Sequence, residues 1–152
     1  MADTESVERV IPASPEAIFA LVADPTRHHE IDGSGTVREA TVSPGPFGVG
    51  STFHTSMKLG VAYSMVNTVI AYEPNRVIAW QTRPPSGVLG KLVGGRIWRY
   101  DLEPVEGGTR VTETWDISQE RQKWAVGPMR KKTRTAMAAT LARIDEVVSR
   151  PT

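Results

Sequence analysis

Residues 129–148 have the sequence MRKKTRTAMAATLARIDEVV, in which apolar positions recur at steps of three and four residues. The stripe consists of Met129, Thr133, Met137, Leu141, Ile144 and Val148. This period is typical of an amphipathic α-helix that packs one face against a core. We therefore expect one long helix from about Trp124 to Val148. Gly127-Pro128 either kinks this helix or marks its true start, which would leave residues 119–126 as a separate turn.

Two alternating strands precede this helix within RIWRYDLEPVEGGTRVTETWDI, residues 96–117, and the pair Gly107-Gly108 predicts the turn between them. Because strand side chains change face at every step, one parity of each strand faces inward. The more polar parity should face outward. The inward residues are then Trp98, Tyr100, Leu102, Val111, Glu113, Trp115 and Ile117, and the turn places Tyr100 near Glu113.

The remaining chain is punctuated by proline and glycine into a strand, a short helix and further strands. Ser14-Pro15 predicts the start of the first helix, and Asp24-Pro25 its end. A short helical turn is expected at 26–31, and strands at 6–11, 36–42, 51–59, 62–72 and 77–83. The segment 84–95, with Leu89 among its apolar residues, is expected to be a long loop that acts as a lid.

Composition favours one soluble intracellular domain over residues 1–152, and we expect a cytoplasmic location. The 152 residues are 39% hydrophobic and 23% charged, with a formal charge of only +1, so no nucleic-acid partner is expected. No apolar run is long enough for a membrane span. The absence of cysteine removes disulfides and thiol chemistry.

Four stretches together resemble a known family: ERVIPASPEAIFALVADP (8–25), IAYEPNRVIAW (70–80), YDLEPVEGGTRVTETW (100–115) and the terminal helix. In order and spacing they are similar to the START-like or SRPBCC superfamily, and within it to the polyketide cyclase/dehydrase group. The resemblance implies an α+β helix-grip fold, in which a curved antiparallel β-sheet wraps around a long C-terminal α-helix and encloses an internal cavity. It also implies a small hydrophobic ligand, such as a lipid or polyketide. The superfamily has no universal catalytic motif, so no active site follows from the resemblance.

The alternation predicts which side chains line that cavity, although a slip of one residue in a strand register would turn them outward. The predicted ligand-binding residues are Phe53, Met57, Met65, Asn67, Trp80, Leu89, Arg96, Trp98, Tyr100, Glu113, Trp115, Met137 and Leu141. Of these, Glu113 and Tyr100 are the candidate catalytic residues, because burial raises the pKa of a carboxyl group. Alternatively, Glu113 forms an ion pair with Arg96 or lies on the surface, and Tyr100 and Asn67 make ordinary core hydrogen bonds.

His28-His29-Glu30, Asp32 and His54 have the side chains of a metal site, but their spacing argues against one. Adjacent residues of a helical turn point in different directions, and His54 has the outward parity of its strand. A solvated pocket rim is the better interpretation of the histidines. No serine-nucleophile elbow or phosphate-binding glycine motif is present, so we expect neither a metal nor a cofactor.

Binding of a small hydrophobic ligand, as carrier or sensor, is the function that the sequence favours. The alternative is a polyketide cyclase/dehydrase-type enzyme that uses an acid/base carboxyl group. A co-chaperone-like interaction module is a second alternative, and it would require an exposed apolar patch. Neither the ligand nor the oligomeric state follows from the sequence.

Overall fold

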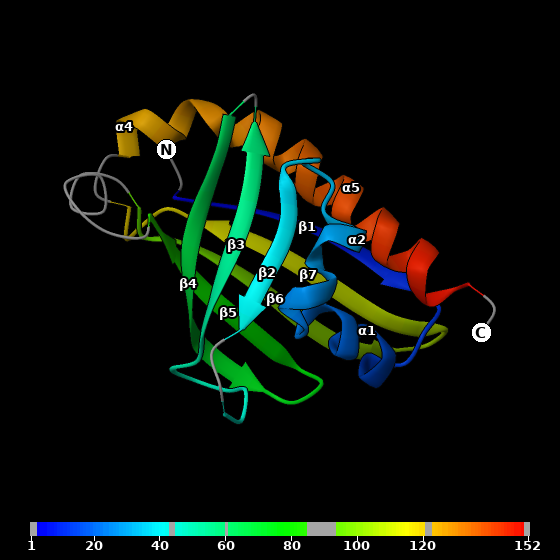
Figure 1. The fold of residues 1–152 in the computed structure, drawn as a ribbon. Helices are drawn as coiled ribbons and strands as arrows, with labels where there is room; N and C mark the ends of the chain where they lie inside the picture. The colour runs from blue at the N-terminus through cyan, green and yellow to red at the C-terminus, as the bar shows by residue number, and fades with distance from the viewer. Residues whose placement is uncertain (1–2, 43–44, 60, 85–93, 121–122, 151–152) are drawn as a thin grey trace.

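The computed structural model describes residues 3–42, 45–59, 61–84, 94–120 and 123–150. In this part of the chain, one antiparallel sheet of seven strands has the order β1-β7-β6-β5-β4-β3-β2 (Figure 1). The strands are β1 (Thr4–Ile11), β2 (Val37–Val42), β3 (Thr52–Leu59), β4 (Val61–Glu73), β5 (Val77–Arg83), β6 (Arg96–Val105) and β7 (Gly108–Asp116). The α+β class and the antiparallel sheet are confirmed.

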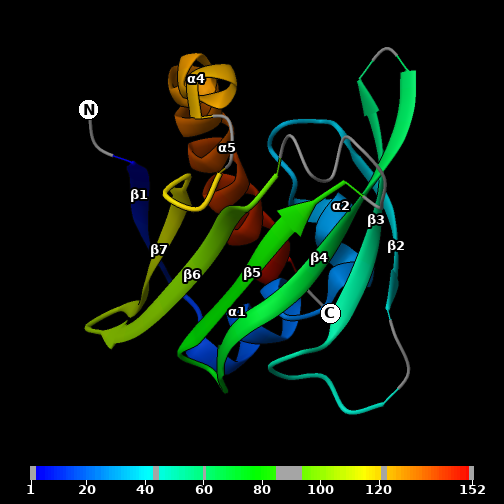
Figure 2. The same cartoon turned by 90° about the vertical axis from the view of Figure 1, so that its left-hand side faces the viewer.

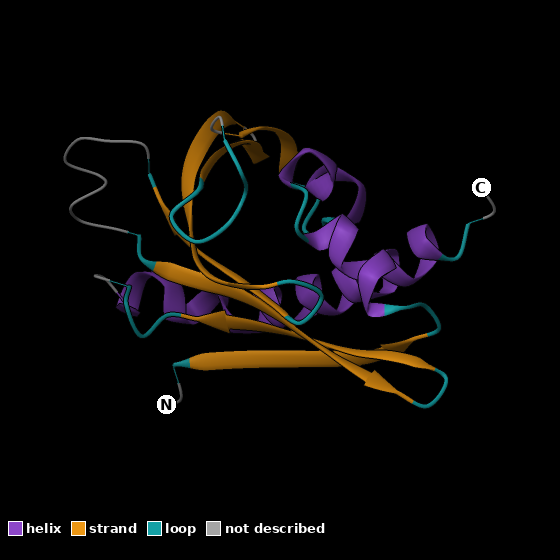
Figure 3. Cartoon of the chain, turned by 90° about the horizontal axis from the view of Figure 1, so that it is seen from below, coloured by secondary structure: helices purple, strands orange, loops and turns teal. Residues whose placement is uncertain are grey.

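The sheet curves strongly, so that its two edges rise on either side of the helices (Figure 2). Seen from below, the helices all lie on the same side of the sheet (Figure 3). These are α1 (Pro15–Val22), the 3₁₀ turn η1 (Pro25–Arg27), α2 (His28–Ile31) and the C-terminal α5 (Arg130–Val148). Helix α5 packs along β1 and β7 and also contacts α1 and α2. This arrangement is the helix-grip fold that the sequence predicts.

The predicted strand registers are correct where they bear on the pocket. Tyr100 pairs with Glu113 across β6 and β7, and Gly107 makes the turn between these strands with a φ of +87°. Phe53 pairs with Asn67 across β3 and β4, which fixes the inward face of that hairpin. The alternation therefore predicts the correct inward face of β3 to β7.

The first helix begins where the sequence predicts it. The Ser14 hydroxyl accepts a hydrogen bond from the Ala17 amide at 3.2 Å, and Pro15 occupies the first helical position. An N-cap of this kind satisfies an amide that has no partner within the helix. Ile18, Leu21 and Val22 then enter the main core.

The C-terminal helix is interrupted at Gly127-Pro128, as one of the two alternatives requires. A short α4 (Lys123–Val126) leads into a 3₁₀ turn, η2 (Gly127–Met129), and α5 begins at Arg130. Met137 and Leu141 are buried on the inner face of α5, whereas Met129 precedes the helix and is 41% exposed. The fully buried part of the apolar stripe thus begins at Met137.

Ion pairs fix α5 along the first strand. The Glu5 carboxylate of β1 lies 3.0 Å from Arg130 and 3.6 Å from Arg134, and Arg9 lies 3.0 Å from Asp145. The basic residues of this helix therefore serve partly as contacts to β1. No helix in the described part of the chain is long and apolar enough to cross a bilayer.

Candidate ligand-binding site

A pocket of about 830 Å³ lies between the concave face of the sheet, α2 with the loop that follows it, and the first half of α5. Ten predicted ligand-binding residues contribute to its wall. They are Phe53, Met57, Met65, Asn67, Trp80, Arg96, Trp98, Tyr100, Glu113 and Met137. Strands β3 to β7 supply nine of these side chains, because the curvature of the sheet turns their inward parity toward one space.

Two of the predicted residues that the structure describes, Trp115 and Leu141, are not among those that line the pocket. Trp115 packs in a separate core cluster with Ile117, Val126 and Met137, and Leu141 packs in the main core. Both are buried as predicted, but Trp115 packs in the cluster that includes Val126 of α4, and Leu141 packs in the core that includes the residues of α1. Leu89 and most of the predicted lid lie outside the described residues.

Methionine is concentrated in this wall. Four of the five methionines of the chain line the pocket, namely Met57, Met65, Met129 and Met137. Methionine is unbranched and polarizable, so it adapts to differently shaped apolar surfaces. The wall therefore suits a ligand of irregular apolar shape.

Glu113 is the buried acid of the pocket. Its side chain is 4% exposed, and burial raises the pKa of its carboxyl group to about 8. A hydrogen bond from Tyr100 opposes this rise, and the nearby Asp32 carboxylate adds to it. Burial also raises the pKa of Tyr100 well above its usual value, with Glu113 adding to that shift. At neutral pH both groups therefore carry their protons, and the pair can donate as well as accept hydrogen bonds.

Asn67 is fully engaged in a polar ladder across β3, β4 and β5. The Thr82 hydroxyl donates to Asn67 Oδ1 at 2.7 Å, and Asn67 Nδ2 donates to Thr55 Oγ1 at 2.9 Å and to the Phe53 carbonyl at 3.3 Å. Asn67 lines the pocket, so its predicted position is correct, yet its hydrogen bonds are those of an ordinary core amide. The ladder positions three strands of the pocket wall.

Arg96 does not pair with Glu113. Its guanidinium Nε lies 3.6 Å from Oε2 of Glu120, a buried carboxylate just beyond β7 that also accepts a hydrogen bond from the Gly94 amide. The predicted alternative of an Arg96–Glu113 ion pair is therefore wrong. Glu120 lies outside the alternating strands, so parity gave no indication of this partner.

His28 belongs to the pocket, which corrects its interpretation as a solvated rim. Its ring stacks on Trp80 with centroids 5.1 Å apart, and it meets Phe53 edge-on at 5.8 Å. Nε2 lies 2.8 Å from the Val22 carbonyl, which can only accept, so we assign the proton to Nε2. Burial lowers the pKa of His28 and favours the neutral ring. The sequence contains one indication that His28 faces inward: Ile31, an apolar residue that is buried in the structure, lies three positions later on the same helical face.

Asp32 and Gly33 bring the loop after α2 against the pocket. The Asp32 carboxylate accepts hydrogen bonds from the amides of Ser34, Thr36 and Val37 at 3.0–3.1 Å. The Gly33 amide donates to Thr140 Oγ1 of α5 at 2.9 Å. A Cβ at position 33 would lie 2.3 Å from the Ala136 carbonyl oxygen, so only glycine permits this approach.

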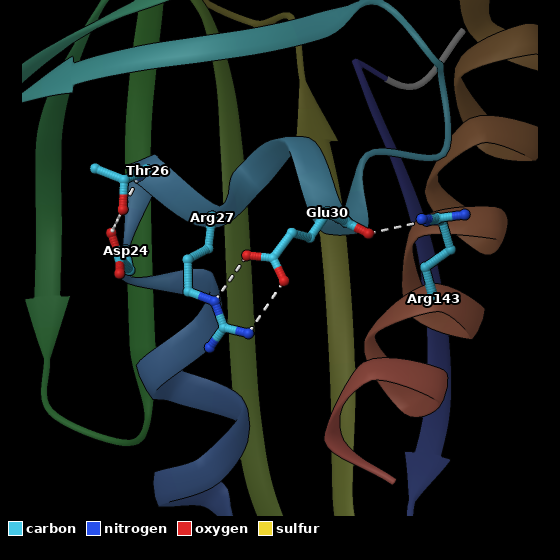
Figure 4. A network of polar contacts seen from close by, with 5 residues as sticks. All are labelled: Asp24, Thr26, Arg27, Glu30 and Arg143. Atoms are coloured by element: carbon cyan, nitrogen blue, oxygen red, sulfur yellow. Dashed lines mark hydrogen bonds and ion pairs between the residues drawn. The ribbon is translucent and has the colours of Figure 1, made fainter. Parts of the chain in front are cut away.

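A polar network fixes α2 from the outside (Figure 4). Arg27 Nε donates to the Glu30 carboxylate at 2.9 Å, and Arg143 Nε of α5 donates to the Glu30 carbonyl at 3.0 Å. In η1, Thr26 is bound to the Asp24 carboxylate. These contacts connect α2 to α5 and so orient the His28 ring.

His54 is exposed on the outer side of β3, as its parity predicts. Within the described residues, no three histidine, aspartate or glutamate side chains cluster closely enough to hold a metal ion.

The sequence of the chain matches a family model along almost its whole length. The model is described as "Polyketide cyclase / dehydrase and lipid transport", and it matches residues 4–149. The chain belongs to this family. Its recognition from the sequence is thereby confirmed.

The chain also resembles other proteins in sequence and in fold. The uncharacterized protein Rv0088 of Mycobacterium tuberculosis is 37% identical over 155 residues, which cover 97% of this chain and 64% of the relative. The chain thus spans less than two thirds of the length of this relative. Among solved structures, protein CV1439 of Chromobacterium violaceum has a TM-score of 0.76 at 17% identity and covers 99% of this chain and 100% of its own. A major latex-like protein of Panax ginseng has a TM-score of 0.71 at 12% identity, with 97% of each chain covered. These structures have the same fold.

Proposed function

We propose that the protein binds one small hydrophobic molecule in the pocket between the sheet, α2 and α5, and acts as its carrier or sensor. The observation that carries this proposal is a pocket of about 830 Å³ with four methionines and two tryptophans in its wall. Pockets for small molecules commonly measure about 300–1,000 Å³ and are mostly apolar with few polar groups. A description of the family that includes lipid transport agrees with this function.

The polar groups of the pocket favour binding over catalysis. Asn67 makes its hydrogen bonds within the polar ladder, and the Asp32 carboxylate accepts hydrogen bonds from the turn that follows it. His28 Nε2 donates to the Val22 carbonyl. The pair of Glu113 and Tyr100 is then the principal acid/base candidate. Acid/base enzymes often have two titratable groups in different environments, whereas these two side chains share one buried environment.

Native mass spectrometry of the purified protein, followed by extraction of any bound compound, tests this proposal directly. Two alanines of α5 provide matched variants, because Ala136 lines the pocket and Ala138 is exposed. We expect Ala136→Phe to weaken binding of the neutral dye N-phenyl-1-naphthylamine at least about tenfold, a loss equivalent to about 1.4 kcal/mol. Ala138→Phe should bind as the wild type does. Equal affinity in all three proteins would contradict binding at this site.

An enzyme of polyketide cyclase/dehydrase type is the second candidate, and the Glu113 pKa of about 8 favours it. A carboxyl group with a pKa near the working pH can both donate and accept a proton during turnover. If the protein is an enzyme, the extracted compound should change in mass or ring pattern on incubation with fresh protein. Glu113→Gln should then lower the rate by about 10²–10⁴-fold. A compound recovered unchanged would favour the carrier.

A further inference from the structure

The Glu113 carboxyl group has one oxygen atom without a hydrogen-bond partner in the part of the chain that the structure describes. Oε1 is buried and has no hydrogen-bond partner among the described residues, although the side chain lines the pocket. Arg96 Nε and Glu120 Oε2 also lack hydrogen bonds within the described chain, but they carry opposite charges and lie 3.6 Å apart. Glu113 Oε1 has no such compensation. Because buried polar atoms nearly always have partners, a bound ligand is a reasonable source of the missing one.

The surroundings determine which form of Glu113 meets the ligand. Asp32 from the loop after α2 is a negative neighbour, and Tyr100 is a hydrogen-bonding one. His28 of α2 is neutral because burial lowers its pKa, and Arg96 of β6 is paired with Glu120. Lys131 and Lys132 of α5 also line the pocket, but both are exposed to solvent. Near pH 7 Glu113 is therefore a neutral acid, and its hydroxyl is a hydrogen-bond donor.

We propose that the ligand is a neutral apolar molecule with a carbonyl-type oxygen, and that this oxygen accepts a hydrogen bond from the protonated carboxyl group of Glu113. This inference rests on the proposed function, since it assumes that the pocket is occupied. It adds a polar group to the ligand and assigns the residue that recognises it. A ketone, an ester or a quinone has the required chemistry.

The same surroundings disfavour charged ligands at this position. A carboxylate would bring another negative charge beside Asp32, and it would have to lose its hydration in a mostly apolar pocket. A protonated amine would be attracted to Asp32 and would ionise Glu113, which makes it the main competing ligand class. The ligand series below therefore includes both.

Four probes with one skeleton separate these possibilities: 2-ethylnaphthalene, 2-acetylnaphthalene, 2-naphthoate and 1-(2-naphthyl)ethylamine. Their affinities are measured at pH 6.5 by displacement of N-phenyl-1-naphthylamine. We expect the ketone to bind about five- to tenfold more tightly than the hydrocarbon, the usual net effect of one hydrogen bond. Among the hydrocarbon, the ketone and the carboxylate, the carboxylate should bind most weakly. Tighter binding of the amine or of naphthoate than of the ketone would overturn the inference.

Variants and pH identify Glu113 as the donor. Glu113→Leu should lower the affinity for the ketone to that for the hydrocarbon. Glu113→Gln should still bind the ketone more tightly than the hydrocarbon, because its amide still donates a hydrogen bond. Glu103→Leu, at an exposed acid of β6, is the control and should resemble the wild type. In the wild type the ketone advantage should disappear as the pH rises through 8, and in Glu113→Gln it should persist. This pH comparison holds even if the leucine variant fails to fold.

The two proposals fail in different ways. If 2-ethylnaphthalene binds but the ketone has no advantage at any pH, the pocket takes apolar ligands and the role of Glu113 is refuted. If none of the four probes displaces the dye, or the dye itself does not bind, both proposals are overturned together.

Discussion

Tyr100 and Glu113 lie directly opposite each other on β6 and β7, with both side chains buried on the concave face of the sheet. The pairing lets the Tyr100 hydroxyl bind the carboxyl group in an environment that excludes water. The hydrogen bond favours the ionised acid and burial opposes ionisation, and burial is the larger effect. Protonation of this pair therefore connects the stability of the fold to the chemistry of the pocket.

The first prediction concerns stability against pH in Glu113→Gln. The folded-state pKa of about 8 is above the ordinary value of 4.5, so between these values the folded protein binds more protons than the unfolded chain. The contribution of this group is consequently most favourable below pH 4.5 and is lost as the pH rises to 8, with a slope of at most about 1.4 kcal/mol per pH unit. Glu113→Gln should remove this slope and gain relative stability toward pH 8. Urea unfolding between pH 5 and 9 measures it, and parallel curves for both proteins would contradict it.

Tyr100→Phe should raise the pKa of Glu113 further, because it removes the hydrogen bond that stabilises the ionised carboxylate. Carbon-13 NMR of labelled glutamate carboxyl groups follows this titration directly. Tyr72→Phe is the control, since the Tyr72 ring packs against Phe19 and Phe47 and is not among the residues that line the pocket. A Glu113 pKa that falls in Tyr100→Phe would show that the hydroxyl acts in the opposite sense.

His28 should contribute a loss of stability at mildly acidic pH. Burial lowers its pKa below 6.5, so the unfolded chain takes up a proton before the folded protein does, and stability falls as the pH drops below 6.5. His28→Phe keeps an aromatic ring beside Trp80 but cannot titrate. The free energy of unfolding of this variant should be about 1 kcal/mol lower at pH 7, because the Val22 carbonyl loses its donor. Its stability should nevertheless fall less steeply toward pH 5 than that of the wild type. His54→Gln, which replaces an exposed histidine on the outer side of β3, is the control variant.

Gly33→Ala should destabilise the protein by about 1–3 kcal/mol, the usual cost of overpacking. The new Cβ would meet the Ala136 carbonyl and the Thr140 amide of α5, which are backbone atoms that cannot rotate away. Gly48→Ala is the matched control, since a Cβ at that position would have no atom within 4 Å. Thermal unfolding of both variants compares them, and equal stabilities would mean that the loop moves away from α5 at little cost.

The strand faces of this protein were predictable because alternation has only two solutions. The more polar parity of each strand chose between them for the last hairpin, and the turn at Gly107-Gly108 then predicted the pairing of Tyr100 with Glu113. The same rule could not separate pocket from packed core. Trp115 and Leu141 are buried like their neighbours, and only the tertiary structure decides that they pack in the core clusters and do not line the pocket.

The alternating pattern also gave no information on ion-pair and hydrogen-bond partners that lie outside the strands. Glu120 follows β7 without a periodic neighbour, so its contact with Arg96 depends on how that segment folds back toward Gly94. His28 was misplaced because α2 has only four residues, so that Ile31 is the single apolar position that indicates its inner face. The hydrogen bond to Val22, six residues earlier, determines which of the two adjacent histidines turns inward.

The last prediction tests the polar ladder in the pocket wall. Thr82→Val is nearly isosteric but removes the hydroxyl that donates to Asn67 Oδ1, which leaves a buried acceptor without this partner. We expect a loss of about 1–3 kcal/mol in unfolding free energy, the usual cost of an unsatisfied buried group. Thr82→Ser keeps the hydroxyl and should recover most of this loss, which separates the hydrogen bond from packing. Thr112→Val, on the outward face of β7, should be nearly neutral. If Thr82→Val were as stable as the wild type, the hydrogen bond to Asn67 would contribute nothing measurable to stability.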